Sequence, residues 1–127
     1  MAYTDEERIA SNRFSSINSR VSYELDDFWK RSDFIKWFSK QNKCYYCKSS
    51  IEDLDKFYNL DNSKRKLTRG RTLEVDRIKD IQYTEENCVA SCYWCNNAKS
   101  DVFSEKEFKI IGISIGKIIK ERINNKT

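Results

Sequence analysis

Two short stretches of this sequence, Cys44-Tyr45-Tyr46-Cys47 and Cys92-Tyr93-Trp94-Cys95, share the pattern Cys-x-x-Cys and decide the fold. This spacing lets two thiolates from one turn reach a single ion, and a second such turn completes a tetrahedron around zinc. Because protein sulfurs would fill all four positions, we predict one structural Zn²⁺ per chain rather than a catalytic one.

An iron–sulfur cluster and two redox dithiols are the alternatives for these four cysteines. The spacing is not that of a ferredoxin, and no βαβ pattern of the thioredoxin type surrounds either pair, which favours zinc. A shared ion would close the chain between the two pairs into a loop on a rigid base. The fifth cysteine, Cys88, is interpreted as a small buried apolar residue.

The composition is that of a globular protein, with 39% hydrophobic and 35% charged residues among 127. This length fits a single domain over 1–127, in which a bound metal supplements a small core. We predict an α+β fold with a helical N-terminal extension over 1–42, a zinc-bound core over 43–103 and a C-terminal helix over 104–124.

The start of the chain lacks both the basic and the apolar segment of a signal peptide, and the apolar run over 110–119 is too short to cross a bilayer. We therefore expect a soluble protein of the cytoplasm, from a bacterial or phage-like source, with reduced cysteines. The net charge of +4 is weak evidence for a polyanionic partner. The basic residues gather in one run over 64–71 and near the C-terminus, which charge alone explains as a solvated loop and a solvated helix face.

Local patterns predict the elements. Thr4 and Ser104 each precede a glutamate by three residues, as in a capping box that starts a helix. We expect further helices over much of 18–40 and over 50–60, with Ser49 at the start of the latter, and a helix that continues from the second cysteine pair through Lys99. A hairpin is predicted over 67–78, with its second strand at Leu73–Arg77, and a short turn from Thr84 to Asn87.

The core also carries a particular order of motifs. Leu73-Glu74-Val75-Asp76-Arg77-Ile78 follows the first cysteine pair, Tyr83-Thr84-Glu85-Glu86-Asn87 comes next, and the second pair runs into Asn96-Asn97-Ala98-Lys99. In this order, the stretch over 44–103 resembles the HNH endonucleases, whose zinc-stabilised core is a ββα-metal fold. The pair Asp76-Arg77 makes it similar to the Asp-Arg variants of that family, which include restriction endonucleases.

The resemblance implies roles for three residues. In HNH enzymes the first residue of the strand-end pair binds the catalytic metal, a middle asparagine holds the loop, and a residue on the next helix is a second ligand. By resemblance these are Asp76, Asn87 and Asn96, with Mg²⁺ or Mn²⁺ as the catalytic ion, since carboxylate and amide oxygens suit such a hard cation. The alternatives are an Asp76 carboxylate that pairs with a nearby basic side chain and an Asn96 that caps a helix.

The chain has no histidine, and Arg77 stands where the family has its general base. Arginine cannot be deprotonated in a protein, but its fork can grip a phosphate, so we interpret Arg77 as a catalytic phosphate clamp. Tyr23, Tyr58 and Tyr83 are candidate bases by elimination. A metal-bound water that acts without a protein base is the other route.

The leading hypothesis is a metal-dependent endonuclease that hydrolyses DNA phosphodiester bonds, with RNA as the alternative substrate. A homodimer would account for cleavage of both strands. The main alternative is a catalytically inactive HNH-fold module that binds nucleic acid or protein, and a plain zinc-stapled structural domain is a third. The residues predicted to contact the nucleic-acid backbone are Lys64, Arg65, Lys66, Arg69, Arg71 and Lys99.

Overall fold

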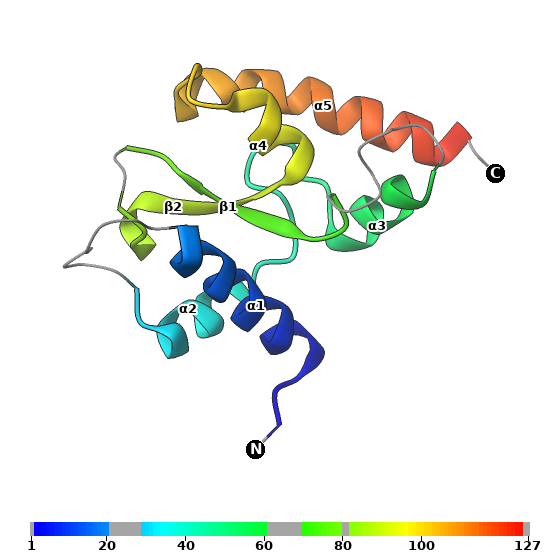
Figure 1. The fold of residues 1–127 in the computed structure, drawn as a ribbon. Helices are drawn as coiled ribbons and strands as arrows, with labels where there is room; N and C mark the ends of the chain where they lie inside the picture. The colour runs from blue at the N-terminus through cyan, green and yellow to red at the C-terminus, as the bar shows by residue number, and fades with distance from the viewer. Residues whose placement is uncertain (1, 21–28, 61–69, 80–81, 126–127) are drawn as a thin grey trace. The chain divides into compact units, whose positions relative to one another are not determined.

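The computed structural model describes residues 2–20, 29–60, 70–79 and 82–125. Within them the chain forms five α-helices, one 3-10 turn and a two-stranded sheet (Figure 1). This mixture confirms the predicted α+β class. In chain order the elements are α1 (Asp5–Arg20), α2 (Arg31–Phe38), α3 (Ile51–Asn59), β1 (Leu73–Arg77), η1 (Glu85–Asn87), β2 (Cys88–Cys92), α4 (Tyr93–Lys99) and α5 (Glu105–Asn125).

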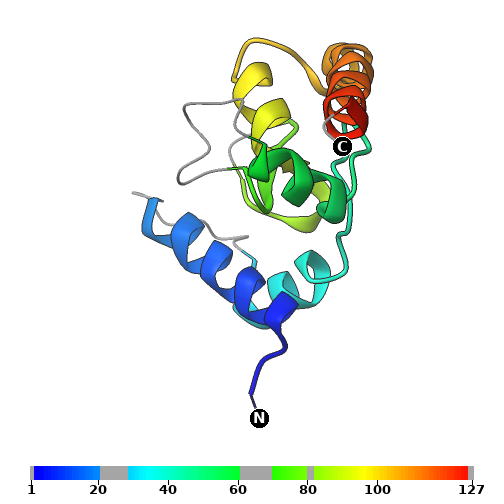
Figure 2. The same cartoon turned by 90° about the vertical axis from the view of Figure 1, so that its right-hand side faces the viewer.

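The chain divides into two compact units. The first comprises residues 1–41 and 77–89, and the second comprises 42–76 and 90–127. In the first unit α1 and α2 pack side by side (Figures 1 and 2). Aromatic side chains form their interface. The ring centroids of Phe14 on α1 and Phe34 on α2 lie 5.5 Å apart. Trp29 meets Phe34 edge-on from just before α2.

In the second unit α5 packs against both α3 and α4 (Figures 1 and 2). Phe108 and Ile119 of α5 are both buried, whereas Ile118 is exposed. The Phe108 ring packs edge-on against Tyr46, in the loop of the first cysteine pair. The final helix therefore covers the cysteine loop.

Two glycines set how closely α5 approaches that loop. A Cβ atom on Gly112 would lie 2.8 Å from the Tyr46 backbone, and one on Gly116 would lie 2.4 Å from the Cys47 carbonyl oxygen. Only a residue without a Cβ fits at these distances. Gly112 and Gly116 are thus positions of close packing between α5 and the cysteine loop.

The predicted helix starts agree with the structure. In both capping boxes, Thr4 with Glu7 and Ser104 with Glu107, each side chain accepts a hydrogen bond from the other residue's backbone N–H. The helix expected over 50–60 is α3, but its cap is Ser50 rather than Ser49, because the Ser50 hydroxyl accepts from the Asp53 N–H. Of the helical region expected over 18–40, residues 21–28 lie outside the described residues.

The strand at Leu73–Arg77 was predicted correctly, whereas its pairing with β2 was not predicted. In the described residues β1 pairs with β2, whereas we expected a hairpin within 67–78; positions 61–69 lie outside the described residues. The β2 sequence, Cys-Val-Ala-Ser-Cys, has small residues and no alternation, so it gave no strand signal. The two strands meet because the 3-10 turn and the Ile78 N–H to Asn87 carbonyl bond (2.8 Å) close the segment between them.

Among the described residues, no helix is both long and apolar enough to cross a membrane.

We predict that Gly116→Ala lowers the free energy of unfolding by about 2 kcal/mol, because overpacking at so short a distance costs about 3 kcal/mol and alanine gains only about 1 kcal/mol in a helix. Thermal unfolding followed by circular dichroism measures the change. Ser114→Ala, at an exposed position of the same helix, is the matched control and should shift stability by less than about 0.5 kcal/mol. Equal melting temperatures for the two variants would contradict the close packing.

Candidate active site

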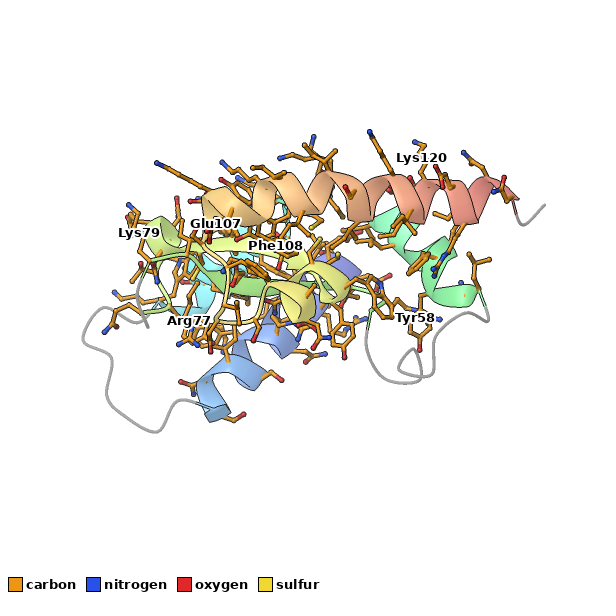
Figure 3. All side chains as sticks on the ribbon, turned by 90° about the horizontal axis from the view of Figure 1, so that it is seen from above. Tyr58, Arg77, Lys79, Glu107, Phe108 and Lys120 are labelled. Atoms are coloured by element: carbon orange, nitrogen blue, oxygen red, sulfur yellow. The ribbon has the colours of Figure 1, made fainter. Side chains whose placement is uncertain are left out.

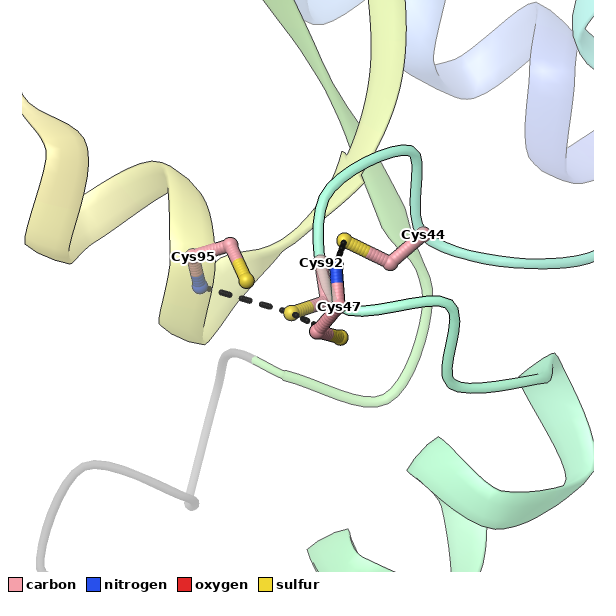
Figure 4. A group of neighbouring side chains, drawn as sticks. All are labelled: Cys44, Cys47, Cys92 and Cys95. Carbon is pink, nitrogen blue, oxygen red and sulfur yellow. Dashed lines mark hydrogen bonds between the residues drawn. The ribbon is translucent and has the colours of Figure 1, made fainter. Parts of the chain in front are cut away.

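Four buried cysteines converge at one point of the second unit (Figure 4). Cys44 and Cys47 come from the loop before α3, Cys92 ends β2, and Cys95 lies in the first turn of α4. Their sulfur atoms all lie within 4.8 Å of one another. The predicted gathering of these four side chains is therefore confirmed.

The local backbone prepares these sulfurs to act as ligands. The N–H groups of Cys47 and Cys95 point at Sγ of Cys44 and Cys92, at 3.5 and 3.3 Å. Hydrogen bonds with Cys47 and the other thiols lower the pKa of Cys44, and bonds with Cys44 and Cys47 raise the pKa of Cys95. The thiols thus share protons that a bound cation would displace.

The spacing of the sulfurs fits a metal of the size of zinc. Sulfurs about 2.3 Å from a tetrahedral zinc lie about 3.8 Å from one another. The distance between Cys47 Sγ and Cys92 Sγ is 3.8 Å. The donor set, four soft thiolates with no oxygen ligand, matches a closed structural site. Cys88, at the start of β2, is buried as expected and does not belong to this cluster.

Asp76 is buried near the end of β1, where it contacts two side chains of the same unit. The Tyr46 hydroxyl donates to Asp76 Oδ2 at 2.5 Å, and the Lys99 ammonium lies 3.3 Å from the same oxygen. Burial and the Asp76 carboxylate raise the pKa of Tyr46, so this phenol stays protonated and acts as a donor. The pairing of Asp76 with a basic side chain is the alternative that the sequence left open.

Asn96 faces the same strand from α4. Its side-chain Nδ2 donates to Glu74 Oε1 at 3.1 Å. Glu74 and Asp76 are two residues apart on β1, and Asn96 and Lys99 are three apart on α4, so both pairs join one face of the strand to one face of the helix. The structure thus brings Asp76 and Asn96 to one interface, where each has its own partner.

Asn87 fastens the loop that follows β1. Its Oδ1 accepts from the Lys79 N–H at 2.9 Å, and its Nδ2 donates to the Gln82 carbonyl at 2.7 Å. Its own backbone carbonyl accepts from Ile78. Both ends of the amide therefore bond within this loop.

The Arg77 guanidinium lies over the ring of Tyr83, 4.6 Å from its centroid. Tyr83 belongs to the loop that Asn87 fastens, so this contact anchors the arginine at the end of β1. Tyr58 of α3, which is labelled in Figure 3, instead contacts Arg71, whose guanidinium carbon lies 4.3 Å from the centroid of its ring. Tyr23 lies outside the described residues.

The predicted backbone-contacting residues are placed as follows. Lys99 is buried against Asp76, and Arg71 contacts Asp55 and Asn59 at 3.2 Å each. Both basic side chains are thus engaged with neighbours within the second unit. The others lie outside the described residues: Lys64, Arg65, Lys66 and Arg69.

Two residues of this region were missed from the sequence. Glu74 shares a face of β1 with Asp76, a consequence of the two-residue period of a strand, and that signal was available. Tyr46 gave no signal, because the turn between two metal-binding cysteines does not reveal which side chain points inward. Its contact with Asp76 spans 30 residues of sequence.

The sequence matches no family model and no curated protein. In structure the chain is similar to the rare-cutting HNH restriction endonuclease PacI, whose reported structure is described in terms of DNA perturbation. The similarity covers 96% of this chain and 92% of that one, with a TM-score of 0.72 and 21% sequence identity. The predicted resemblance to HNH endonucleases is confirmed at the level of the fold.

We predict that the purified protein holds one zinc ion per chain and that Cys95→Ser loses nearly all of it, because removal of one thiolate opens the tetrahedron. Zinc content by elemental mass spectrometry is the measurement, with the melting temperature as a second readout. Cys88→Ala, the matched cysteine outside the cluster, should retain the ion. Full zinc occupancy in Cys95→Ser would show that the cluster does not hold it.

Proposed function

We propose that this protein is a divalent-metal-dependent endonuclease that hydrolyses DNA phosphodiester bonds. The observation that carries the proposal is a pair of polar contacts between β1 and α4. Asp76 on the strand pairs with Lys99 on the helix, and Asn96 on the helix bonds to Glu74 on the strand. The four-cysteine cluster lies at the start of the same helix. The fold shared with an HNH restriction endonuclease supports the same conclusion. A structural zinc at the cysteines would keep the two elements together.

Asp76 and Asn96 are the proposed holders of Mg²⁺ or Mn²⁺. Their oxygens are the hard donors that such cations take, and Glu74 adds a second carboxylate on the same face of β1. Both contacts of Asp76 reach Oδ2, so within the described residues Oδ1 is the oxygen that remains for a ligand. A bound divalent ion would supply positive charge for the phosphate oxygens during hydrolysis.

Arg77 is the proposed grip on the scissile phosphate. Its stacking on Tyr83 keeps the planar guanidinium in one orientation, which favours two parallel hydrogen bonds to phosphate oxygens. In the reaction a water oxygen forms a bond to phosphorus and the bond to the leaving ester oxygen breaks. The water gives up one proton to a base, and the leaving oxygen gains one from solvent.

Tyr83, acting as its phenolate, is the proposed proton acceptor among the candidate tyrosines, because its ring lies against the residue that would hold the phosphate. Tyr58 is engaged with Arg71 on α3, and Tyr46 donates its proton to Asp76. A water molecule activated without a protein base is the competing route.

A second candidate function is a DNA-binding module that does not cleave. The ion pair between Lys99 and Asp76 favours it, since the ammonium already neutralises the carboxylate whose charge would attract a metal. The absence of histidine points the same way. Such a module would keep the fold stabilised by zinc and would still bind phosphate through Arg77, without cleaving DNA.

DNA is the proposed partner in both cases, and a homodimer would account for double-strand cleavage. A reducing compartment such as the cytoplasm would keep the four cluster thiols available for metal.

We predict that the protein nicks supercoiled plasmid with Mg²⁺ or Mn²⁺ and that Asp76→Asn reduces the rate roughly a hundredfold or more, since charge stabilisation at a reacting phosphate is worth about that factor. Asp101→Asn, an exposed acid of the same unit, is the control. Undiminished nicking by Asp76→Asn would refute the assignment. Tight plasmid binding with no nicking in any metal would establish the second candidate.

We further predict that Tyr83→Phe slows cleavage about a hundredfold, because the ring that supports Arg77 remains and only the hydroxyl is lost. Tyr58→Phe should leave the rate unchanged. Rates of plasmid nicking at saturating Mg²⁺ give the comparison. If Tyr83→Phe cuts as fast as the wild type, the water is deprotonated by another route.

A further inference from the structure

A pocket of about 920 Å³ lies within the first unit. None of the residues that line it has a role in the proposed hydrolysis. One wall is formed by Trp29 and α2, and the other by the segment 82–86. The two walls are joined where the Trp29 N–H donates to the Tyr83 carbonyl at 3.2 Å. A hollow of this volume is in the range of small-molecule and nucleotide sites.

The first wall is aromatic. Trp29 is buried, Trp37 is half-buried, and their ring centroids lie 4.8 Å apart with planes inclined by 40°. Phe34 supports Trp37 from below at 6.0 Å. Trp37 therefore offers a flat, fixed apolar surface to the pocket, which is the kind of surface on which a nucleobase stacks.

The same wall carries a positive charge. Lys36 lies beside Trp37 on α2, Lys40 follows the end of the helix, Lys30 precedes its start, and all three line the pocket. Within the part of the chain that the structure describes, none of these three lysines has a carboxylate partner, although Asp33 also lines the wall. Exposed ammonium groups beside an aromatic ring suit a phosphate attached to a stacked base.

The opposite wall accepts hydrogen bonds. Gln82 and Thr84 line it together with the carboxylates of Glu85 and Glu86. A plain anion would be repelled by these two glutamates. A nucleotide satisfies both walls, since its phosphate is negative and an N–H group of its unpaired base can donate a hydrogen bond to a carboxylate.

One segment of the chain carries both a wall of the pocket and the ring that contacts Arg77. Gln82 and Thr84 flank Tyr83 in the chain, and the Tyr83 ring lies under the Arg77 guanidinium. We infer that the pocket between α2 and 82–86 is a subsite for one unpaired DNA nucleotide next to the phosphate held by Arg77. The base stacks on Trp37, and its phosphate is bound by Lys36 and Lys40. The choice of DNA as the nucleic acid that enters the pocket rests on the proposed function.

The test is a binding measurement on the full-length wild-type protein, without added Mg²⁺. The probes are a short single-stranded DNA oligonucleotide of mixed sequence and an abasic strand of the same length and charge. Quenching of tryptophan fluorescence follows binding, with Trp94 of the second unit as a constant background. We expect the strand with bases to bind about tenfold or more tightly than the abasic strand, the factor that base stacking on one aromatic ring supplies.

Two variants of Trp37 separate stacking from folding. Trp37→Phe should keep most of the preference for bases, whereas Trp37→Leu should abolish it and leave the affinity for the abasic strand unchanged. Circular dichroism verifies that both variants fold. Equal wild-type affinity for the two strands, or a preference that survives in Trp37→Leu, would overturn the subsite.

The lysines are tested by salt dependence. Replacing both Lys36 and Lys40 with glutamine should weaken binding of both strands and reduce the slope of log affinity against log salt by about 0.7, the value for one phosphate contact on a single strand. The matched control is Lys56→Gln with Lys106→Gln, two exposed lysines of the second unit. An unchanged slope in the Lys36 and Lys40 variant would contradict the phosphate contact.

This outcome is distinguishable from that of the nuclease proposal. Base preference together with undiminished nicking by Asp76→Asn would retain the subsite and reject the catalytic assignment. Metal-dependent nicking that requires Asp76, without base preference, would reject the subsite alone.

Discussion

The gathering of four thiols at one point is the constraint on which the second unit depends. It ties the loop before α3 to the junction of β2 and α4, about fifty residues further along the chain. A zinc ion held by four thiolates contributes roughly 10–16 kcal/mol to folding, as much as the whole stability of an ordinary domain of about 5–15 kcal/mol. The backbone bond from Tyr45 to Ala90 (2.9 Å) and the close approach of α5 at Gly116 follow from this junction.

The junction has a chemical consequence, because α4 starts at the cysteines and runs along β1. Asn96 and Lys99 on the helix therefore meet Glu74 and Asp76 on the strand, and Tyr46 reaches Asp76 from the cysteine loop itself. A buried carboxylate costs several kcal/mol unless it is paired, so these partners are what permits Asp76 to lie inside. The same partners restrict access to the Asp76 carboxylate. Metal binding by Asp76, which the nuclease proposal requires, therefore depends on whether a cation can compete with the Lys99 ammonium.

In the first unit, several of the contacts described above come from one short loop, which connects β1 to β2. Asn87 bonds the loop at both ends of its amide, Tyr83 supports Arg77, and the residues beside Tyr83 form one wall of the pocket. Because the loop is fixed by hydrogen bonds to its own backbone, its side chains are held in place without a large core. A catalytic grip and a nucleotide subsite can share such a loop, since both would act on one strand of nucleic acid.

The sequence by itself determined what depends on spacing and on local capping. The two cysteine pairs predicted the metal cluster, the capping boxes predicted the starts of α1 and α5, and the motif order predicted the HNH-like fold. Only the tertiary structure decided the pairing of β1 with β2, the inward direction of Tyr46 and the partners of Asp76 and Asn96. These contacts join residues that are from about 15 to 30 positions apart. No local periodicity encodes them, because they exist only once the cysteine junction has brought the strand, the loop and the helix together.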